Sequence, residues 1–559
     1  MRSLLKRSIK RRDLLKYFGA SLAGPAFKNL FRYKKVAAER LVSYVIPPEG
    51  VVPGLPNWYS SVCRQCAAGC GIQVKILEGR AKKIEGNPDF PVNYGSLCAR
   101  GQAGLQVLYN PDRIKGPQLK VDGKFQKISW SRALSIASKR LSEIKAQEGE
   151  DSIHFLTEPL RGSLGSLFST FAGGFETNVF SYDFTNDAGL MEANLRSFGE
   201  ERFANYDIAN SDYILSFGAD FLDTWSSPVK HSKSFGQMRD GLVGKEGGRG
   251  RLVHLEPRLS VTGASADVWL AINPGTEGIL ALAIANVIID EKLFDKSLGI
   301  DRAEWKKALE NYSPKKASAE SGVPKAEIVK IAREFIEHPA SLALCGGQAT
   351  AQVHGTSNAM AANILNFLAG NVGKKGGVFF NSPSPLDNNI EQSITVKGLS
   401  ELSDKMAATE VAALLVYNVN PVFNMPEAVR FDENLRNVGF IVSFSSFMDE
   451  TTAMADLILP SHTYLESWGD FVPLVDGGRR AVGLMQPVVM PVFNTRPVGD
   501  VLLSLAKNIS GLPASLPEKK YFDFLKNSWK ALYESVRESN QVEESFELFW
   551  EKSVQRGGW

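Results

Sequence analysis

The sequence has little cysteine and little histidine for its length. Its 559 residues include five cysteines and six histidines. No two histidines stand at a spacing typical of metal ligands, so they predict no metal site of their own. Four of the five cysteines, by contrast, lie within one short segment. Any metal or sulfur chemistry of this chain is therefore expected in that segment.

Long hydrophobic runs and a uniform charge are also missing. No stretch reaches the roughly 18 apolar residues that a membrane-spanning helix needs, so the body of the chain is not a membrane domain. The net charge is +3, but residues 1–40 hold twelve Lys and Arg against two acidic residues, which leaves −7 for the rest. Because the excess of basic residues is confined to the first 40 positions, a nucleic-acid function has no support.

The basic N-terminal stretch has the form of an export signal. Arg11 and Arg12 precede a weakly apolar run, Tyr17–Ala26, and this order resembles a twin-arginine signal. A basic amphipathic helix is the alternative. We predict a leader over 1–40 and a Pro- and Gly-rich linker over 41–57. The resemblance implies export of a folded protein to the periplasm or to the outer face of the cytoplasmic membrane.

The four clustered cysteines have the spacing C-x2-C-x3-C-x27-C. Cys63, Cys66 and Cys70 share one tight loop, and Cys98 follows later. A cubane iron–sulfur cluster needs four thiolates that converge on one point, and three on one loop supply most of that. Between Cys70 and Cys98 an alternating segment turns at Glu78-Gly79, which predicts a hairpin that brings Cys98 back to the loop.

Two other uses of these cysteines remain open. Structural zinc sites usually contain two C-x2-C pairs, whereas this segment has one such pair followed by an x3 spacing. Two disulfides would suit an exported protein. Cysteines that already hold a cluster before export of the folded chain would not be free to form them.

The same segment carries a family resemblance. The motif Cys98-Ala-Arg100-Gly101, followed by Leu-Tyr-Asn-Pro-Asp-Arg-Ile at 108–114, resembles the cluster domain of the complex iron–sulfur molybdoenzymes. Similar segments continue to residue 559. The form at 450–462 closely resembles a signature of the family, and the form at 486–503 looks most like the large subunits of alternative complex III and of the menaquinone reductase complex. The resemblance implies that Arg100 lies between a cluster and a pterin.

Short apolar segments alternate with helical patterns along the rest of the chain, which predicts α/β domains with parallel sheets. One helix is expected to begin at Ser131 as its N-cap. The expected strands are Ser152–Leu156, Tyr213–Phe217, Gly250–Leu255, Ser341–Cys345, Ala413–Tyr417 and Phe440–Ser445.

The resemblance implies the molybdopterin-oxidoreductase fold: a small β-rich [4Fe–4S] domain and two doubly wound α/β domains, with the family's β-barrel-like fourth domain missing from this sequence. The expected domains are the [4Fe–4S] domain at 58–116, a discontinuous α/β domain at 117–175 plus 341–510, a nucleotide-binding-like α/β domain at 176–340, and C-terminal helices at 511–559.

Glycines and small polar residues follow several predicted strands, where open α/β sheets bind ligands. In the family these segments hold molybdopterin guanine dinucleotide. The matching residues here are Arg100, Gly218, Asp220, Glu256, Arg258, Gly275 and Glu277. The family usually has Asn where this chain has Asp220 and Asp where it has Glu256. A carboxylate at Asp220 would repel a phosphate group.

A molybdenum site of this family usually takes a protein ligand from Cys, selenocysteine, Ser or Asp near the start of the third domain. The corresponding residues 180–187 contain no cysteine, and Asp187, Asp183 and Ser181 are the candidate ligands, with Asp187 the first choice. Cys345 is expected to be a core residue. His462 follows a Leu-Pro-Ser segment and is expected to be a structural histidine, with a pocket-lining role as the alternative.

The leading hypothesis is an exported electron-transfer subunit of a quinone-linked respiratory complex, with one [4Fe–4S] cluster on Cys63, Cys66, Cys70 and Cys98. The expected partners are a ferredoxin-like multi-cluster subunit and an integral membrane subunit that faces the quinone, with a cytochrome c subunit as a further candidate. The rival is an active oxidoreductase carrying molybdenum or tungsten on two molybdopterin guanine dinucleotides. A non-redox interaction platform, with zinc or no metal, is the third hypothesis.

Overall fold

The computed structural model falls into two compact units, Met1–Leu55 and Pro56–Trp559. The residues that it describes are 52, 54–182, 188–240, 248–380, 384, 386, 392–393, 396–474, 480–509, 512, 516–539, 542 and 544–559. The predicted leader and most of the predicted linker lie outside this part of the chain. So do Asp183 and Asp187.

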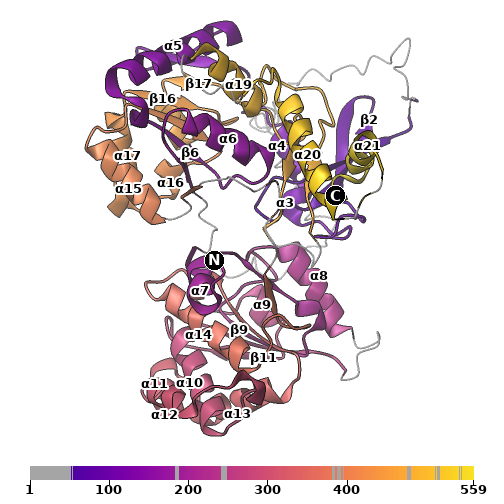
Figure 1. Ribbon diagram of the computed structural model, residues 1–559, viewed down its shortest axis with the longest axis vertical. Coiled ribbons are helices and arrows are strands. Elements are labelled where there is room, and N and C mark those ends of the chain that lie inside the picture. Colours follow the sequence, from indigo (N-terminus) through magenta and orange to yellow (C-terminus); the bar gives the residue numbers. More distant parts are fainter. Residues whose placement is uncertain are drawn as a thin grey trace, which may run out of the picture. The chain divides into compact units, whose positions relative to one another are not determined.

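Three antiparallel strands open the second unit, in the order β1 (Asn57–Val62), β2 (Gly71–Leu77) and β3 (Arg80–Gly86). The predicted hairpin is present, and Glu78 and Gly79 form its turn with φ of 50° and 76°. Two short helices follow, α3 (Ala99–Gln102) and α4 (Gly104–Leu108). These elements are drawn in indigo and violet in Figure 1.

An eight-stranded sheet forms the first α/β domain, in the order β14-β7-β6-β15-β16-β17-β4-β5. Its strands are parallel from β14 to β17, and β4 pairs antiparallel with both β17 and β5. In chain order they are β4 (Gln118–Val121), β5 (Lys124–Lys127), β6 (Ile153–Thr157), β7 (Val179–Ser181), β14 (Gln392–Ser393), β15 (Ala413–Tyr417), β16 (Phe440–Ser443) and β17 (Leu457–Ile458).

Helices cover both faces of this sheet because its strands are apolar on both sides. Ile153 and Phe155 of β6 pack into one apolar cluster, whereas Leu156 packs into another on the opposite face. The first cluster includes α5 (Trp130–Glu148), α6 (Ser163–Gly173) and α19 (Val498–Asn508). The second includes α15 (Val396–Ala407) and α17 (Phe431–Asn434), with α16 (Pro421–Asn424) and α18 (Glu450–Met454) nearby.

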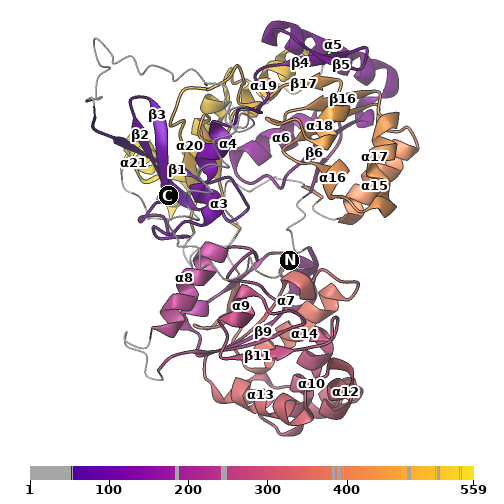
Figure 2. The same ribbon diagram turned by 180° about the vertical axis from the view of Figure 1, so that it is seen from behind.

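A four-stranded parallel sheet forms the second α/β domain, in the order β11-β10-β9-β12. Its strands are β9 (Tyr213–Phe217), β10 (Arg251–Glu256), β11 (Val268–Ala271) and β12 (Ser341–Cys345), and a small antiparallel pair joins β8 (Ala204–Tyr206) to β13 (Val378–Phe380). Its helices are α7 (Ala188–Phe198), α8 (Pro228–Arg239), α9 (Val261–Ala264), α10 (Glu277–Asp290), α11 (Arg302–Ala308), α12 (Pro314–Ser321), α13 (Lys325–Glu337) and α14 (Gly355–Leu368). Figure 2 shows α10, α12 and α13 grouped on this sheet.

The two predicted borders between the α/β domains are wrong. The chain was expected to return to the first domain at residue 341, but β12 pairs with β9 of the second sheet. The second domain was expected to begin at residue 176, but β7 pairs with β6 of the first sheet. A strand's apolar pattern shows that it is buried and does not show which sheet it joins.

The last part of the chain contains the short antiparallel pair β18 (Gly469–Phe471) and β19 (Gly483–Met485), followed by α20 (Tyr521–Glu538) and α21 (Phe546–Arg556). The two amphipathic helices expected near the end are therefore present. Trp468, which precedes β18, packs with aromatic side chains of these helices: Phe522, Trp529, Tyr533, Phe546, Phe549 and Trp550. Across the described residues, no helix has the length and apolar content to cross a bilayer.

Candidate metal centre and adjoining cavity

Strands β1 and β2 hold the two ends of the cysteine loop. Cys63 follows the last residue of β1, and Cys70 precedes the first residue of β2. The Cys63 N–H donates to the Cys70 carbonyl at 2.8 Å, which closes the loop at its base. Gly69 adopts φ +60°, and a Cβ there would lie 2.3 Å from a ring carbon of Phe471. Only glycine fits this position without moving the ring.

One asparagine ties the segment of Cys98 to this loop. The Asn93 amide oxygen accepts the Gly71 N–H at 2.9 Å, and its nitrogen donates to the Gly71 carbonyl at 2.8 Å. The same nitrogen donates to the Ser96 carbonyl at 2.7 Å, two residues before Cys98. Asn93 is buried and was missed by sequence reasoning, since asparagine in a loop normally indicates only a turn.

The structure brings the four predicted ligands together. Cys63 and Cys70 are buried, Cys66 and Cys98 are half-buried, and all are free thiols, so the disulfide alternative is not the state shown. Burial raises the pKa of Cys63 to about 12, and the charges of Cys66 and Cys98 add to this effect. Burial and the other three cysteines also raise the pKa of Cys70. Thiolates that repel one another in a buried place need a bound cation, which is what iron would supply.

The kind of metal is indicated by the cysteine spacing, since the positions of the side chains do not decide it. Within the described residues, no group of three or more His, Cys, Asp or Glu side chains is placed so that it could hold a metal ion. Three cysteines on one loop and a fourth that returns to it form a pattern typical of a cubane, in which each thiolate binds a different iron. A structural zinc site usually has two C-x2-C pairs.

Arg64 carries positive charge beside the cluster position. Its guanidinium donates to Glu158 at 2.7 Å and lies 4.1 Å from the centre of the Phe471 ring. The Arg64 side chain is only 15% exposed. Because Glu158 directly follows β6, this ion pair links the cysteine loop to the carboxyl end of a strand in the first α/β sheet.

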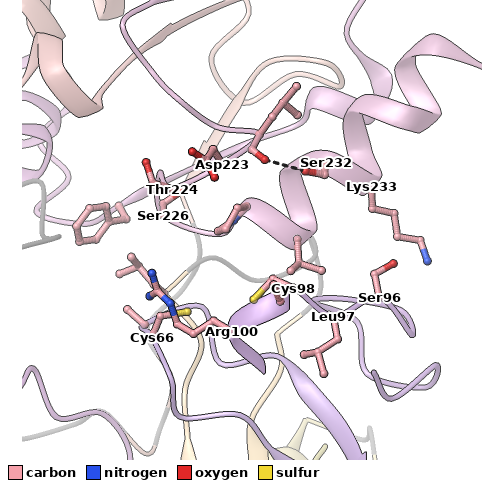
Figure 3. A pocket seen from close by; sticks show the side chains of 17 residues that line it. Cys66, Ser96, Leu97, Cys98, Arg100, Asp223, Thr224, Ser226, Ser232 and Lys233 are labelled. Carbon is pink, nitrogen blue, oxygen red and sulfur yellow. Dashed lines mark hydrogen bonds between the residues drawn. The ribbon is translucent and has the colours of Figure 1, made fainter. Parts of the chain in front are cut away.

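Arg100 lies on the wall of a cavity of about 850 Å³ beside Cys66 and Cys98. Figure 3 shows these three residues on one wall and the loop residues Asp223, Thr224 and Ser226 on the facing wall. Helix α8 contributes Ser232 and Lys233 to the lining. Lys233 also joins the two walls, since its ammonium donates to the Tyr94 carbonyl at 2.7 Å.

The predicted nucleotide-binding residues gather at the carboxyl ends of β9 and β10. Gly218 follows β9 with φ +62°. Asp220 is buried; its carboxylate accepts hydrogen bonds from Thr262 at 2.8 Å and from Arg258 at 3.3 Å. The negative charge expected to repel a phosphate is thus balanced by Arg258, whose side chain remains largely exposed.

Glu256 serves the backbone next to it. It accepts the Ser260 N–H at 2.7 Å and lies 3.2 Å from the His254 Nε2. Burial acts to raise the pKa of Glu256, but the hydrogen bonds from His254 and Ser260 outweigh burial and lower it. Glu256 is therefore an ionised residue that shapes the loop before α9.

Glu277 differs, because it lacks a full set of partners. It is the first residue of α10 and is 1% exposed. Burial raises the pKa of Glu277, and Gln352 donates to one carboxylate oxygen at 3.4 Å. The other oxygen has no hydrogen-bond partner among the described residues. Gly275, with φ +83°, brings the backbone close to Gln352. These residues could accept a donor group of a cofactor.

His462 and Cys345 each make contacts that suit a structural role. His462 lines a smaller cavity of about 200 Å³, and its Nδ1 lies 2.6 Å from the Thr495 hydroxyl. Burial lowers the pKa of His462, which keeps it neutral near pH 7. Cys345 is the last residue of β12 and is buried in the core of the second domain.

Comparisons with known proteins agree with this geometry. The family described as "Molybdopterin oxidoreductase" matches residues 113–508, and the "Molybdopterin oxidoreductase Fe4S4 domain" matches residues 56–110. The second match contains the three loop cysteines, Cys98 and Arg100.

Two curated relatives indicate the range of the resemblance. The menaquinone reductase, molybdopterin-binding-like subunit of Nitratidesulfovibrio vulgaris is 30% identical over 81% of this chain and 65% of its own length. The arsenate respiratory reductase molybdopterin-containing subunit of Shewanella sp. is 26% identical over 82% of this chain and 61% of its own length. The chain thus spans less than two thirds of the length of these relatives.

Among solved structures, acetylene hydratase from Pelobacter acetylenicus superposes with a TM-score of 0.70 over 84% of this chain and 71% of its own. The sequences are 20% identical, so the likeness concerns the fold. Together with the two sheets described above, it confirms the predicted α/β fold class with an N-terminal cluster domain.

Proposed function

The chain belongs to the molybdopterin oxidoreductase family, and we propose that it is an iron–sulfur electron-transfer subunit of a quinone-linked respiratory complex. The observation that carries this proposal is the meeting of four thiols at the end of β1, the start of β2 and the start of α3. A [4Fe–4S] cluster held there would pass single electrons, with a potential set by ligands, charge and burial.

A complete molybdenum site of its own is not part of the proposal. Beyond the four cluster cysteines the sequence contains only Cys345, and the structure buries it in β12. No cysteine occurs in residues 180–187, where the family's ligand is expected. The ion pair of Arg64 and Glu158 also occupies the edge of the first sheet. These features favour a molybdoenzyme fold that serves mainly as a scaffold.

The proposed setting follows from the same reasoning. The name of the Nitratidesulfovibrio vulgaris relative connects that protein to menaquinone. We infer a ferredoxin-like multi-cluster partner, a membrane partner that faces the quinone, and a cytochrome c subunit as a further candidate. The twin-arginine-like leader supports export, with the chain peripheral on the outer face of the membrane.

The test is metal analysis and electron paramagnetic resonance (EPR) of the anaerobically purified complex. We expect iron and sulfide for one [4Fe–4S] cluster on this chain, an EPR signal that depends on reduction, and no stoichiometric molybdenum or tungsten. Stoichiometric molybdenum or tungsten on this chain would refute the scaffold proposal. A colourless, EPR-silent chain, before and after reduction, would instead favour the non-redox platform.

A second candidate is a working enzyme with molybdenum or tungsten on two molybdopterin guanine dinucleotides. The cavity of about 850 Å³ beside Arg100 favours it, since organic ligands occupy pockets of about 300–1,000 Å³. The unpartnered oxygen of Glu277 also suits a bound cofactor. Asp187→Ala should abolish turnover and leave the cluster intact if this candidate is correct.

A further inference from the structure

Tyr464 lies against the cysteine loop, although nothing in the motif pattern connects the two. It packs against the apolar cluster of the iron–sulfur domain, which includes Cys63 and Cys70. Cys63 and Gln65 are the side chains that interact with its hydroxyl. The hydroxyl oxygen is buried, and no hydrogen bond of good geometry satisfies it among the described residues.

The hydroxyl is held in place from two directions. On one side is Gly104 of α4, where a Cβ would lie 2.1 Å from the Tyr464 oxygen. The main chain of Tyr464 is held by hydrogen bonds of its two sequence neighbours. The Thr463 N–H donates to the buried Glu466 at 2.8 Å, and the Leu465 carbonyl accepts the Val488 N–H at 2.9 Å. These contacts restrain the position of the phenol next to Cys63.

A buried hydroxyl that faces a cysteine has a use once that cysteine is a metal ligand. A thiol is a weak acceptor, but a cluster-bound sulfur carries negative charge and accepts hydrogen bonds well. Reduction adds a further negative charge to the cluster, so a donor to its sulfur favours the reduced state. The Tyr464 hydroxyl is the donor that the structure places there.

We propose that the Tyr464 hydroxyl donates a hydrogen bond to the cluster-bound sulfur of Cys63, and that this bond raises the reduction potential of the cluster. Tyr464 is thus a positioning and tuning residue. The proposal rests on the cluster assigned to the four cysteines. It does not depend on the identity of the electron partners.

The test is Tyr464→Phe in the full chain, with iron content and an EPR-monitored redox titration. The ring and its packing stay, and only the donor is removed. We expect unchanged iron content and a more negative reduction potential. The shift should be about 59 mV for one electron, which raises the ratio of oxidised to reduced cluster about tenfold at a fixed solution potential. The EPR signal of the reduced cluster should also change.

Tyr109→Phe is the matched control. Tyr109 packs on the same apolar cluster, but its hydroxyl accepts the Ala81 N–H at 2.9 Å. We expect this variant to keep the wild-type potential. An unchanged potential in Tyr464→Phe with full iron content overturns the proposal, and so does an equal shift in both variants.

A second variant reaches the same hydroxyl from the opposite side. The new methyl group of Gly104→Ala would push the oxygen away from its present position, and we expect a lower potential here too. Should Tyr464→Phe fail to hold iron, the potential of Gly104→Ala decides, and a wild-type value there overturns the proposal. Absence of iron from the wild-type chain would instead overturn the cluster assignment itself.

Discussion

The ion pair between Arg113 and Glu466 should be the most sensitive point between the cluster domain and the first α/β domain. The guanidinium donates to the two carboxylate oxygens at 3.2 and 2.8 Å, and both side chains are 0% exposed. Arg113 also donates to the Leu108 carbonyl at the end of α4. Glu466 accepts two further hydrogen bonds from Thr463 and one from the Val492 N–H. One change here therefore disturbs both domains.

We choose Glu466→Gln, because it keeps the size of the side chain, removes the charge and replaces one accepting oxygen with an NH2 donor. The Arg113 guanidinium would then stay buried without a counter-charge, and breaking a buried pair in this way costs about 3–5 kcal/mol. A loss of about 3 kcal/mol corresponds to a rise of roughly 100-fold in the equilibrium constant for local opening. This opening should be local, since Arg113 leads directly out of the cluster domain.

Hydrogen exchange followed by mass spectrometry would measure that opening. Peptides that cover residues 104–114 and 463–471 should exchange faster in Glu466→Gln, while peptides of the second α/β domain should not change. The control is Glu433→Gln, which breaks an exposed pair with Arg430 and should have no measurable effect. Equal exchange in the two variants would show that the buried pair does not hold the domains together.

Three further outcomes are expected. Cys98→Ser should lose the iron of the chain, whereas Cys345→Ser should keep it, as measured by iron analysis and visible absorption. Gly69→Ala should lower iron content and cost about 1–3 kcal/mol, because its φ of +60° is strained and its Cβ would clash with Phe471; normal iron loading would contradict this. Burial acts to raise the pKa of Glu466, but the hydrogen bonds from Arg113, Val492 and Thr463 outweigh it and lower the pKa. The stability from Glu466 is therefore present above its unfolded-state pKa of about 4.3 and is lost as pH falls through the lowered folded value, so acid titration should be flatter in Glu466→Gln.

The local structure of this chain was readable from its sequence where one element carries the whole signal. The β2–β3 hairpin and its turn at Glu78 and Gly79 are as predicted, because alternation and turn residues act within a few positions. The start of α5 was missed by two residues. Ser129, not Ser131, caps it, with its hydroxyl accepting the Arg132 N–H at 3.3 Å. Helical periodicity predicts which face of a helix is buried more reliably than it predicts the residue at which the helix begins.

The candidate site was predictable only in part, because its partners come from distant segments. Cysteine spacing pointed to four residues that the structure places together. Nothing in the spacing pointed to Asn93, which fixes the segment of Cys98, or to Glu158, which pairs with Arg64. The effect of Asp220 was predicted as repulsion of phosphate; the structure adds Arg258, whose charge offsets that effect. A side chain's charge can be read from the sequence, but the ion that balances it requires the fold.

The same reasoning explains why residues 546–559 belong physically to the cluster domain. Trp559 and Val482 exchange two backbone hydrogen bonds at 2.8 Å, and the Asn87 side chain donates to the Arg556 carbonyl at 2.6 Å. Because β19 lies beside β1, the end of α21 completes the packing around the strand that leads to Cys63. The cluster domain is therefore built from segments more than 400 residues apart. The four cysteines themselves lie within residues 63–98. Residues 546–559, by contrast, are expected to join this domain only after the two α/β domains between those segments have folded, since closing so long a loop without them would cost more chain entropy than a few backbone hydrogen bonds return.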